Sequence, residues 1–305
     1  MKELRYDAPY DKPVVIAMGF FDCVHRGHAE VIAHAARIAR ERHAQCAVFT
    51  FRNDIGAMFG KKKQLYTYEE RLDLFGDLGV ETVLYADCDT DFANMRAVGF
   101  LDRLSCGKII EGVAAGEDYT FGKGAEGDAE FLRSYFQSAH ATVCIAQFVT
   151  DDGRKISSTE IKDAIERGDV KYADECLTEP YFMKGRIVHA HRRGTAMGFP
   201  TANMLPSRDK LALGQGVYAT TLTVDGRTYT GGTNVGIKPT FDDNAYSVET
   251  YLTDFDGDLY GKDVKLAFYD RIRGIVKFDS AEELQSQLRT DMEKIADIFR
   301  RREQN

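Results

Sequence analysis

Two histidines and two glycines stand close together near the start of the chain, in the stretch MGFFDCVHRGHAEVI at residues 18–32. An apolar run precedes them and a pattern with helical spacing follows, so the stretch predicts a strand, a tight loop and the start of a helix. A helix N-terminus attracts anions, because its first backbone N–H groups lack partners within the helix and the helix dipole is positive there. The chemistry that this predicts is phosphate binding.

His25 and His28 lie three residues apart at this helix start, so their side chains face the same way. Both imidazoles could donate hydrogen bonds to phosphate oxygens, and their charge could follow the charge that develops during group transfer. Gly19 and Gly27 let the backbone come close to such a ligand. The alternative is that one or both histidines are ordinary polar residues of a turn, and the short motif alone gives the two interpretations equal weight.

A second stretch, ISSTEIK at residues 156–162, follows the last apolar run of the first half. Ser157 and Glu160 fit a capping box that opens a helix. Taken alone, this stretch would more often be a simple helix cap. At the carboxyl edge of a parallel sheet, a second helix start rich in hydroxyl groups favours a nucleotide site. The residues in it that could bind phosphate are Ser157, Ser158, Thr159 and Lys162.

The composition limits the classes of protein that remain. Forty basic against 48 acidic residues among 305 give a net charge of −8, which argues against a broad surface for DNA or RNA. The first residues have no apolar signal core and no later stretch is long and apolar enough to span a membrane, so we expect a cytoplasmic protein without a membrane partner. Six scattered cysteines without a CxxC pair predict neither a disulfide framework nor a zinc site. The oligomeric state is left open.

The first half of the chain alternates apolar runs with segments of helical period, which predicts a mainly parallel sheet with helices on both faces. One helical segment places Val31, Ile32, Ala35, Ile38 and Ala39 on its buried side. The expected strands are VVIAM from residue 14, CAVFTF from 46, ETVLYA from 81, KIIEGVAAG from 108 and ATVCIAQFV from 141.

The pattern changes after about residue 180. Strand pairs joined at Asp225-Gly226 and around Asp256-Gly257 predict an antiparallel sheet or small barrel, and a capped helix from Ser280 closes the chain. We place the boundary within residues 171–185 and expect one domain at 1–175 and another at 183–305.

With these elements in place, the N-terminal half resembles the HxGH nucleotidyltransferases. The whole chain is similar to the bacterial bifunctional riboflavin kinase/FMN adenylyltransferase (FAD synthetase) family. The resemblance implies an α/β, Rossmann-like nucleotidyltransferase domain followed by an antiparallel β-barrel riboflavin kinase domain with a C-terminal helix. Its motifs in the first half are GFFDCVHRGH, GEDYTFGKGAEGD at 116–128 and ISSTEIK. In the second half they are GRIVHAHRRGTAMGFPTAN at 185–203, GVYA, NVGIKPTF, VETYLTDFDGDLYGK and RIRGIVKF.

For the kinase half, the resemblance implies transfer of phosphate from ATP to riboflavin with Mg²⁺ held by Thr201 and Asn203. Glu249 would be the base that takes the proton of the ribityl 5′-hydroxyl, whereas by itself it would pass for a solvated charge on a strand. The loop residues that would bind the nucleotide are Gly194, Gly198 and Pro200, and their alternative is an ordinary turn between strands. Arg273 and Asp291 would line the flavin end, where a surface arginine and an ordinary helix aspartate are nearly as common.

For the first half, the resemblance implies that the FMN phosphate attacks the α-phosphorus of a second ATP, which releases pyrophosphate and gives FAD. His25, His28 and the serines and lysine of ISSTEIK would hold the triphosphate. Asp118 and the loop through Phe121 would help to form the pocket, unless that loop is only a glycine-rich turn. The remaining nucleotide-binding residues implied are Gly19, Phe20, Gly27 and Thr159.

The first half also departs from the family pattern. Cys23 stands where the family has glycine, Tyr119-Thr120 replace Phe-Arg, and Lys162 replaces arginine. The stretch TFRND at 50–54 lacks the usual Pro-His-Pro. Two other functions therefore remain: a riboflavin kinase whose first domain no longer transfers adenylyl groups, and a sensor that binds flavin or nucleotide without turnover.

Overall fold

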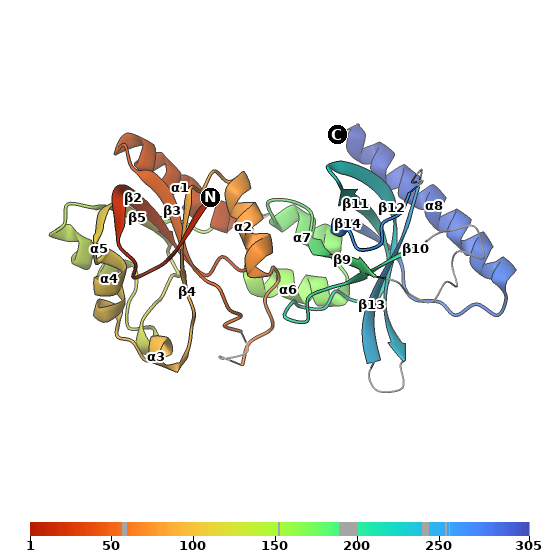
Figure 1. The fold of residues 1–305 in the computed structure, drawn as a ribbon, viewed down its shortest axis with the longest axis horizontal. Helices are drawn as coiled ribbons and strands as arrows, with labels where there is room; N and C mark the ends of the chain where they lie inside the picture. The colour runs from red at the N-terminus through yellow and green to blue at the C-terminus, as the bar shows by residue number, and fades with distance from the viewer. Residues whose placement is uncertain are drawn as a thin grey trace. The chain divides into compact units, whose positions relative to one another are not determined.

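The structure is a computed structural model that describes residues 1–56, 60–151, 153–188, 201–239, 244–253, 255 and 257–304. The chain divides into two compact units, residues 1–158 and residues 159–305 (Figure 1). Among the described residues, no helix is both long and apolar enough to cross a membrane.

The first unit is built on a six-stranded sheet in the order β1-β4-β3-β2-β5-β6, and every neighbouring pair is parallel. All five expected strands are confirmed. The sixth, β1, was not predicted, because four residues at the start of a chain give no clear period. The strands are β1 (Lys2–Arg5), β2 (Tyr10–Met18), β3 (Gln45–Phe51), β4 (Thr82–Ala86), β5 (Lys108–Gly116) and β6 (Thr142–Ala146).

Helices pack on this sheet through the apolar sides that the sequence predicts. In α1, the buried residues are the five expected from the pattern. Alternate residues of β2, such as Val14 and Ile16, share a core with Phe100 of α4 and Leu132 of α5. The helices of this unit are α1 (Arg26–Glu41), α2 (Tyr68–Asp77), α3 (Thr90–Ala93), α4 (Ala97–Ser105) and α5 (Ala129–Gln137), with a 3₁₀ turn at Lys123–Ala125 and a small hairpin of β7 (Thr150–Asp151) and β8 (Arg154–Lys155).

The second unit is a closed antiparallel barrel in the order β10-β13-β12-β11-β14-β9, which confirms the predicted barrel. The hairpin between β11 and β12 turns at Asp225 and Gly226, both with positive φ (49° and 74°), as a type I′ turn requires. The elements are α6 (Ser158–Arg167), α7 (Val170–Cys176), β9 (Phe182–Val188), β10 (Thr201–Leu205), β11 (Gly216–Val224), β12 (Arg227–Pro239), β13 (Asn244–Leu252), β14 (Asp263–Arg273) and α8 (Ala281–Glu303).

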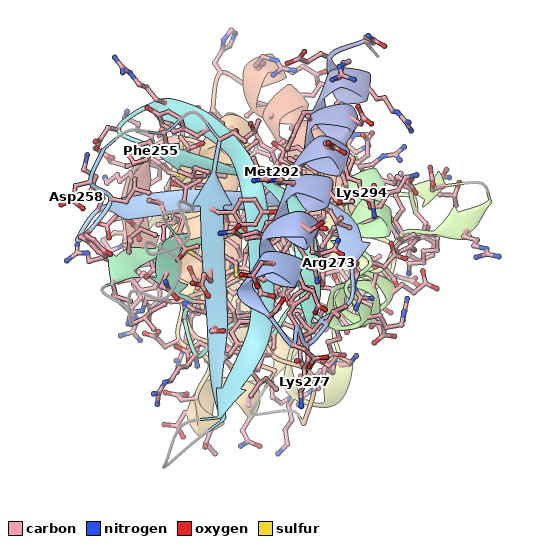
Figure 2. All side chains as sticks on the ribbon, turned by 90° about the vertical axis from the view of Figure 1, so that its right-hand side faces the viewer. Phe255, Asp258, Arg273, Lys277, Met292 and Lys294 are labelled. Carbon is pink, nitrogen blue, oxygen red and sulfur yellow. The ribbon has the colours of Figure 1, made fainter. Side chains whose placement is uncertain are left out.

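Helix α8 lies across the outside of the barrel (Figure 2). The Ser280 side chain caps it by accepting a hydrogen bond from the Glu283 N–H at 3.1 Å, while the Glu283 carboxylate accepts from the N–H of Asp279 rather than of Ser280. Ile295 is buried against Ala219 and Tyr251 of the barrel. The predicted helix start is confirmed, with one partner of the expected capping box shifted by a residue.

Helices α6 and α7 belong to the same compact unit as the barrel, except for Ser158. The Gly214 N–H donates to the Ile165 carbonyl at 2.9 Å, and the Arg271 guanidinium donates to the Arg167 carbonyl at 3.3 Å. These contacts explain why the compact units meet at residues 158 and 159. The boundary within 171–185, with domains at 1–175 and 183–305, stays a prediction, because packing alone does not define where a domain ends in sequence.

Candidate active sites

The loop between β2 and α1 brings His25 and His28 together at a helix start. His25 is the N-cap residue of α1, and its Nδ1 accepts a hydrogen bond from the His28 backbone N–H at 3.2 Å. The two imidazole rings stack with centroids 3.6 Å apart and planes 14° from parallel. A Cβ on Gly27 would lie 3.1 Å from the His25 ring, so glycine lets the ring fold back against the helix start. The predicted juxtaposition of the two histidines is therefore present.

Burial keeps both imidazoles neutral at neutral pH. Desolvation lowers the pKa of His25 to about 4, against a smaller opposing effect of the Asp118 carboxylate. Desolvation and the neighbouring His25 ring lower the pKa of His28 well below its usual value. Because His25 Nδ1 accepts a hydrogen bond, the neutral ring has its proton on Nε2. Nε2 therefore carries the proton that the uncharged ring can donate.

The backbone of this loop is strained at two residues other than glycine. Phe21 and Val24 have φ of 53° and 41°, in the left-handed region that a β-branched residue such as Val24 rarely adopts. Cys23 is buried and does not have a positive φ. The cysteine in the position of the family glycine therefore imposes no backbone strain. Gly19 is needed instead, because a Cβ there would lie 2.8 Å from the Phe21 ring.

The ISSTEIK stretch begins beside this loop. Cys23 Sγ lies 3.9 Å from the carbonyl of Ser158, the first residue of α6. The expected helix start is confirmed, and within the first unit Ser157 and Ser158 lie two and three residues after the end of β8. Thr159 and Lys162 lie further along α6, in the part grouped with the second unit.

Two ion pairs involve the hairpin of β7 and β8. Lys155 Nζ lies 2.8 Å from Asp118 Oδ2 and 3.3 Å from the centre of the Phe148 ring. Arg26, the first residue of α1, pairs with Asp151 at 3.2 Å. The predicted site residue Asp118 thus has a basic partner that the sequence reasoning missed. The position of Lys155 directly before the ISST residues places it near the predicted site, but its pairing with Asp118 depends on which loops the fold brings together.

The loop through Phe121 is fixed by the core. Phe121 is only 8% exposed, stacks on Tyr119 and exchanges two backbone hydrogen bonds with Gly127. A Cβ on Gly127 would lie 2.6 Å from the Phe121 ring, so the loop closes only with glycine there. Phe121 therefore shapes the loop from inside, and the small exposed part of its ring is all that a ligand can contact.

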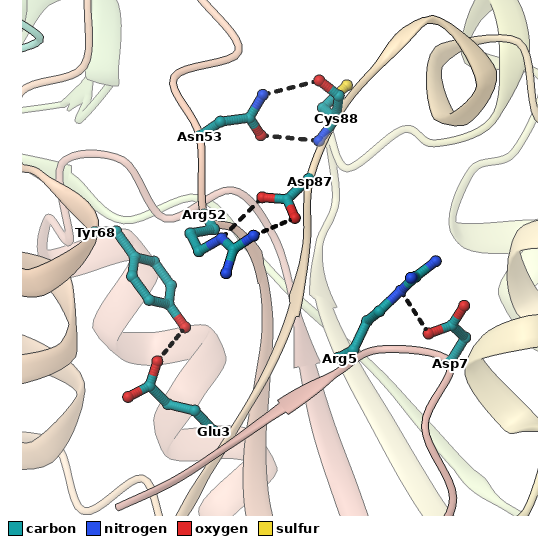
Figure 3. A network of polar contacts seen from close by, with 8 residues as sticks. All are labelled: Glu3, Arg5, Asp7, Arg52, Asn53, Tyr68, Asp87 and Cys88. Carbon is teal, nitrogen blue, oxygen red and sulfur yellow. Dashed lines mark hydrogen bonds and ion pairs between the residues drawn. The ribbon is translucent and has the colours of Figure 1, made fainter.

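The TFRND stretch is tied to the next strand by side chains. Arg52 donates to Asp87 at 2.9 Å, and the Asn53 amide both donates to the Cys88 carbonyl and accepts from the Cys88 N–H, each at 2.8 Å (Figure 3). These bonds hold the segments that follow β3 and β4 side by side. The stretch that lacks Pro-His-Pro is therefore ordered by polar contacts.

On the barrel, Thr201 and Glu249 meet on neighbouring strands. Asn203 of β10 pairs in register with Glu249 of β13, and the Thr201 hydroxyl donates to Glu249 Oε1 at 2.8 Å. Thr201, Asn203 and Glu249 share one face of the sheet, because side chains two residues apart in a strand point the same way. The structure therefore brings together the three residues predicted for phosphoryl transfer. Gly194, Gly198 and Pro200 lie outside the described residues.

Arg273, the last residue of β14, and Asp291 of α8 form an ion pair. Arg273 donates to both Asp291 oxygens, with a shortest distance of 2.8 Å, and Gln287 donates to Oδ1 at 2.8 Å (Figure 2 labels Arg273). Asp291 is 0% exposed, whereas 16% of the Arg273 side chain is exposed. Of this pair, Arg273 is the one that can contact a ligand.

Comparison with known proteins agrees with this geometry. The family model for FAD synthetase matches residues 7–160, and that for riboflavin kinase matches residues 177–299. The chain is 33% identical to the bifunctional riboflavin kinase/FMN adenylyltransferase of Bacillus subtilis over 93% of this chain and 92% of that protein. For the protein of the same name from Listeria monocytogenes, the identity is 35% with the same shares covered. The chain belongs to the bifunctional riboflavin kinase/FMN adenylyltransferase family.

A solved structure extends the likeness to both units. A Streptococcus pneumoniae protein described as a macrolide-efflux protein matches with a TM-score of 0.85 at 32% identity, over 95% of this chain and 97% of that one. As a family member, the chain phosphorylates riboflavin to FMN with ATP and adenylylates FMN to FAD with a second ATP.

Proposed function

We propose that the barrel transfers phosphate through Glu249. The riboflavin 5′-hydroxyl gives its proton to this carboxylate, its oxygen attacks the γ-phosphorus of ATP, and ADP leaves. The 2.8 Å hydrogen bond from Thr201 supports this role, because it fixes the carboxylate beside the residues that face the phosphates. Arg273 contacts the flavin end, and Asp291 acts through it by holding the guanidinium.

The residues of this face also fit Mg²⁺. The Thr201 hydroxyl and the Asn203 amide are neutral oxygen donors, and Mg²⁺ is commonly bound by few protein oxygens together with waters and substrate phosphates. When bound, Mg²⁺ would neutralise charge on the phosphates during transfer.

In the first unit, His25 and His28 donate to the triphosphate while FMN attacks the α-phosphorus. The stacked pair at the start of α1 supports this role, because the hydrogen bond accepted by His25 Nδ1 leaves the ring proton on Nε2, from which it can be donated. Ser157 and Ser158 add donors from the next helix start, and Gly19, Phe20 and Gly27 form the loop that approaches the nucleotide. Thr159 and Lys162 are assigned to the phosphates on the sequence motif alone. Asp118 and Phe121 shape the remaining wall.

The test is to supply FMN, ATP and Mg²⁺ and to measure FAD and pyrophosphate. Equal amounts of both products are expected. Formation of FMN from riboflavin without any FAD would favour the kinase with an inactive first domain. That alternative has less support here, because the His25 and His28 pair is assembled and Cys23 is accommodated without strain. Binding of either substrate without turnover would favour the sensor.

A further inference from the structure

Arg71 lies in the first turn of α2 and its side chain is completely buried. Its guanidinium donates to the Phe20 carbonyl at 3.0 Å, to the Thr50 hydroxyl at 2.6 Å and to the Phe51 carbonyl at 2.6 Å. It also lies 5.0 Å from the centre of the Phe20 ring. A single cation thus contacts the segments at the carboxyl ends of β2 and β3.

The Phe20 carbonyl receives two of these hydrogen bonds. The Thr50 hydroxyl donates to it at 2.6 Å, and Arg71 donates to it from α2. A trans peptide is planar, so fixing this carbonyl also fixes the Phe21 N–H, which points to the opposite side. The Phe21 residue that follows has a positive φ of 53°. The arginine therefore sets the direction of the peptide at which the histidine loop begins.

If Arg71 only filled the core, its burial would be unfavourable for folding. Burial lowers its pKa to about 10, so the guanidinium stays charged at neutral pH, and the Asp22 carboxylate favours this charge. The two carbonyls and the hydroxyl that accept its hydrogen bonds are uncharged, and its Nε–H has no acceptor among the described residues. An unsatisfied buried donor and a buried charge both oppose folding. The same charge lies behind the edge where a triphosphate is to bind, and burial strengthens its field there.

We propose that Arg71 is a positioning residue for adenylyl transfer. It acts through the Phe20 carbonyl, by holding the Phe20–Phe21 peptide in the orientation that the nucleotide meets. The inference rests on the proposed nucleotide site at this edge of the sheet. Lysine at this position would keep the charge but, as a point donor, could not span two carbonyls and a hydroxyl.

The test compares Arg71→Lys and Arg71→Met in the full chain. We expect kcat for FAD formation from FMN to fall about 10-fold with lysine and about 100-fold with methionine, because a small misplacement of the reacting groups has effects of this size. KM for FMN should change little. Arg71→Lys should keep the hydrogen-exchange protection of β2, and FMN formation by the barrel should be unchanged in both variants.

Arg42→Met is the matched control. Arg42 follows the far end of α1 and donates to the Thr142 hydroxyl, so its loss should leave both activities intact. Thr50→Val should also lower kcat for FAD formation, because it removes the hydroxyl that donates to the Phe20 carbonyl and accepts from Arg71. Full FAD formation by Arg71→Lys, or a loss that follows only the loss of β2 protection, would overturn the inference. If the unmodified protein forms no FAD, the proposed adenylyltransferase site fails instead.

Discussion

The two proposed nucleotide sites of this chain are built from different kinds of groups. At the edge of the parallel sheet, the proposed donors are two stacked neutral imidazoles and the N–H groups of helix starts. On the barrel, the proposed site consists of oxygen-bearing side chains on paired antiparallel strands, where the Thr201 hydroxyl donates to the Glu249 carboxylate. In this proposal, the first arrangement stabilises charge on a nucleotide without a base, because phosphate is already a nucleophile. The second supplies a carboxylate, because an alcohol must lose its proton.

The largest change in rate is expected for a variant of Glu249, the proposed base on the barrel. Glu249→Gln keeps the shape and the acceptor for Thr201 but removes the base, so FMN formation should fall by about 10² to 10⁴. Riboflavin should still bind, as measured by quenching of its fluorescence. FAD formation from supplied FMN should persist, because that reaction belongs to the other unit.

Glu293→Gln is the matched control for this change. Glu293 is an exposed carboxylate on α8 of the same unit, and its replacement should leave FMN formation unchanged. Near-normal turnover of Glu249→Gln would show that Glu249 is not the base. The proposed contrast between a barrel site with a base and a sheet-edge site without one would then fail.

The next effect tests the sheet edge. His28→Ala should lower FAD formation by about 10² to 10³, the usual loss for one electrostatic donor in a transition state, and should spare the kinase. The control is His34→Ala on the same helix, where the imidazole lies near Glu30 at 3.4 Å. Equal loss of both activities in a protein that remains folded by circular dichroism would indicate a structural histidine.

Lys162 tests a departure from the family pattern. Lysine keeps the positive sign of arginine but lacks its planar fork, so Lys162→Ala should lower kcat/KM for ATP in FAD formation by about 1.5 to 3 kcal/mol, the value of a charge-assisted hydrogen bond. Lys162→Arg should retain or improve it. Lys171→Ala, an exposed lysine on α7, is the control. Unchanged ATP kinetics in Lys162→Ala would remove this residue from the phosphate site.

Elements with a clear period were predictable, and contacts between distant segments were not. The strands, α1 and the barrel follow from patterns of 2 and 3.6 residues, and the HxGH loop follows from its spacing. Lys155 as the partner of Asp118 and Arg71 behind Phe20 depend on which loops the fold brings together. In the sequence, Arg71 stands three and four residues before Leu74 and Phe75, so a helical period would place it on the same side as these apolar residues. Only the structure shows that the charge there is buried.

The smallest effect concerns pH and should be confined to the sheet edge. The pKa of His25 is lowered to about 4, so between pH 6.5 and 4 the unfolded chain binds more protons than the folded one. Stability of the first unit should therefore rise with pH through this window, and on going from pH 7 to pH 5 the His25 contribution falls by about 2 kcal/mol. Urea unfolding at both pH values, followed by hydrogen exchange in β2, measures it. His25→Asn is the control, because asparagine can also accept the N-cap hydrogen bond but does not titrate. An equal loss of stability in this variant would show that other groups, rather than the His25 imidazole, cause the pH dependence.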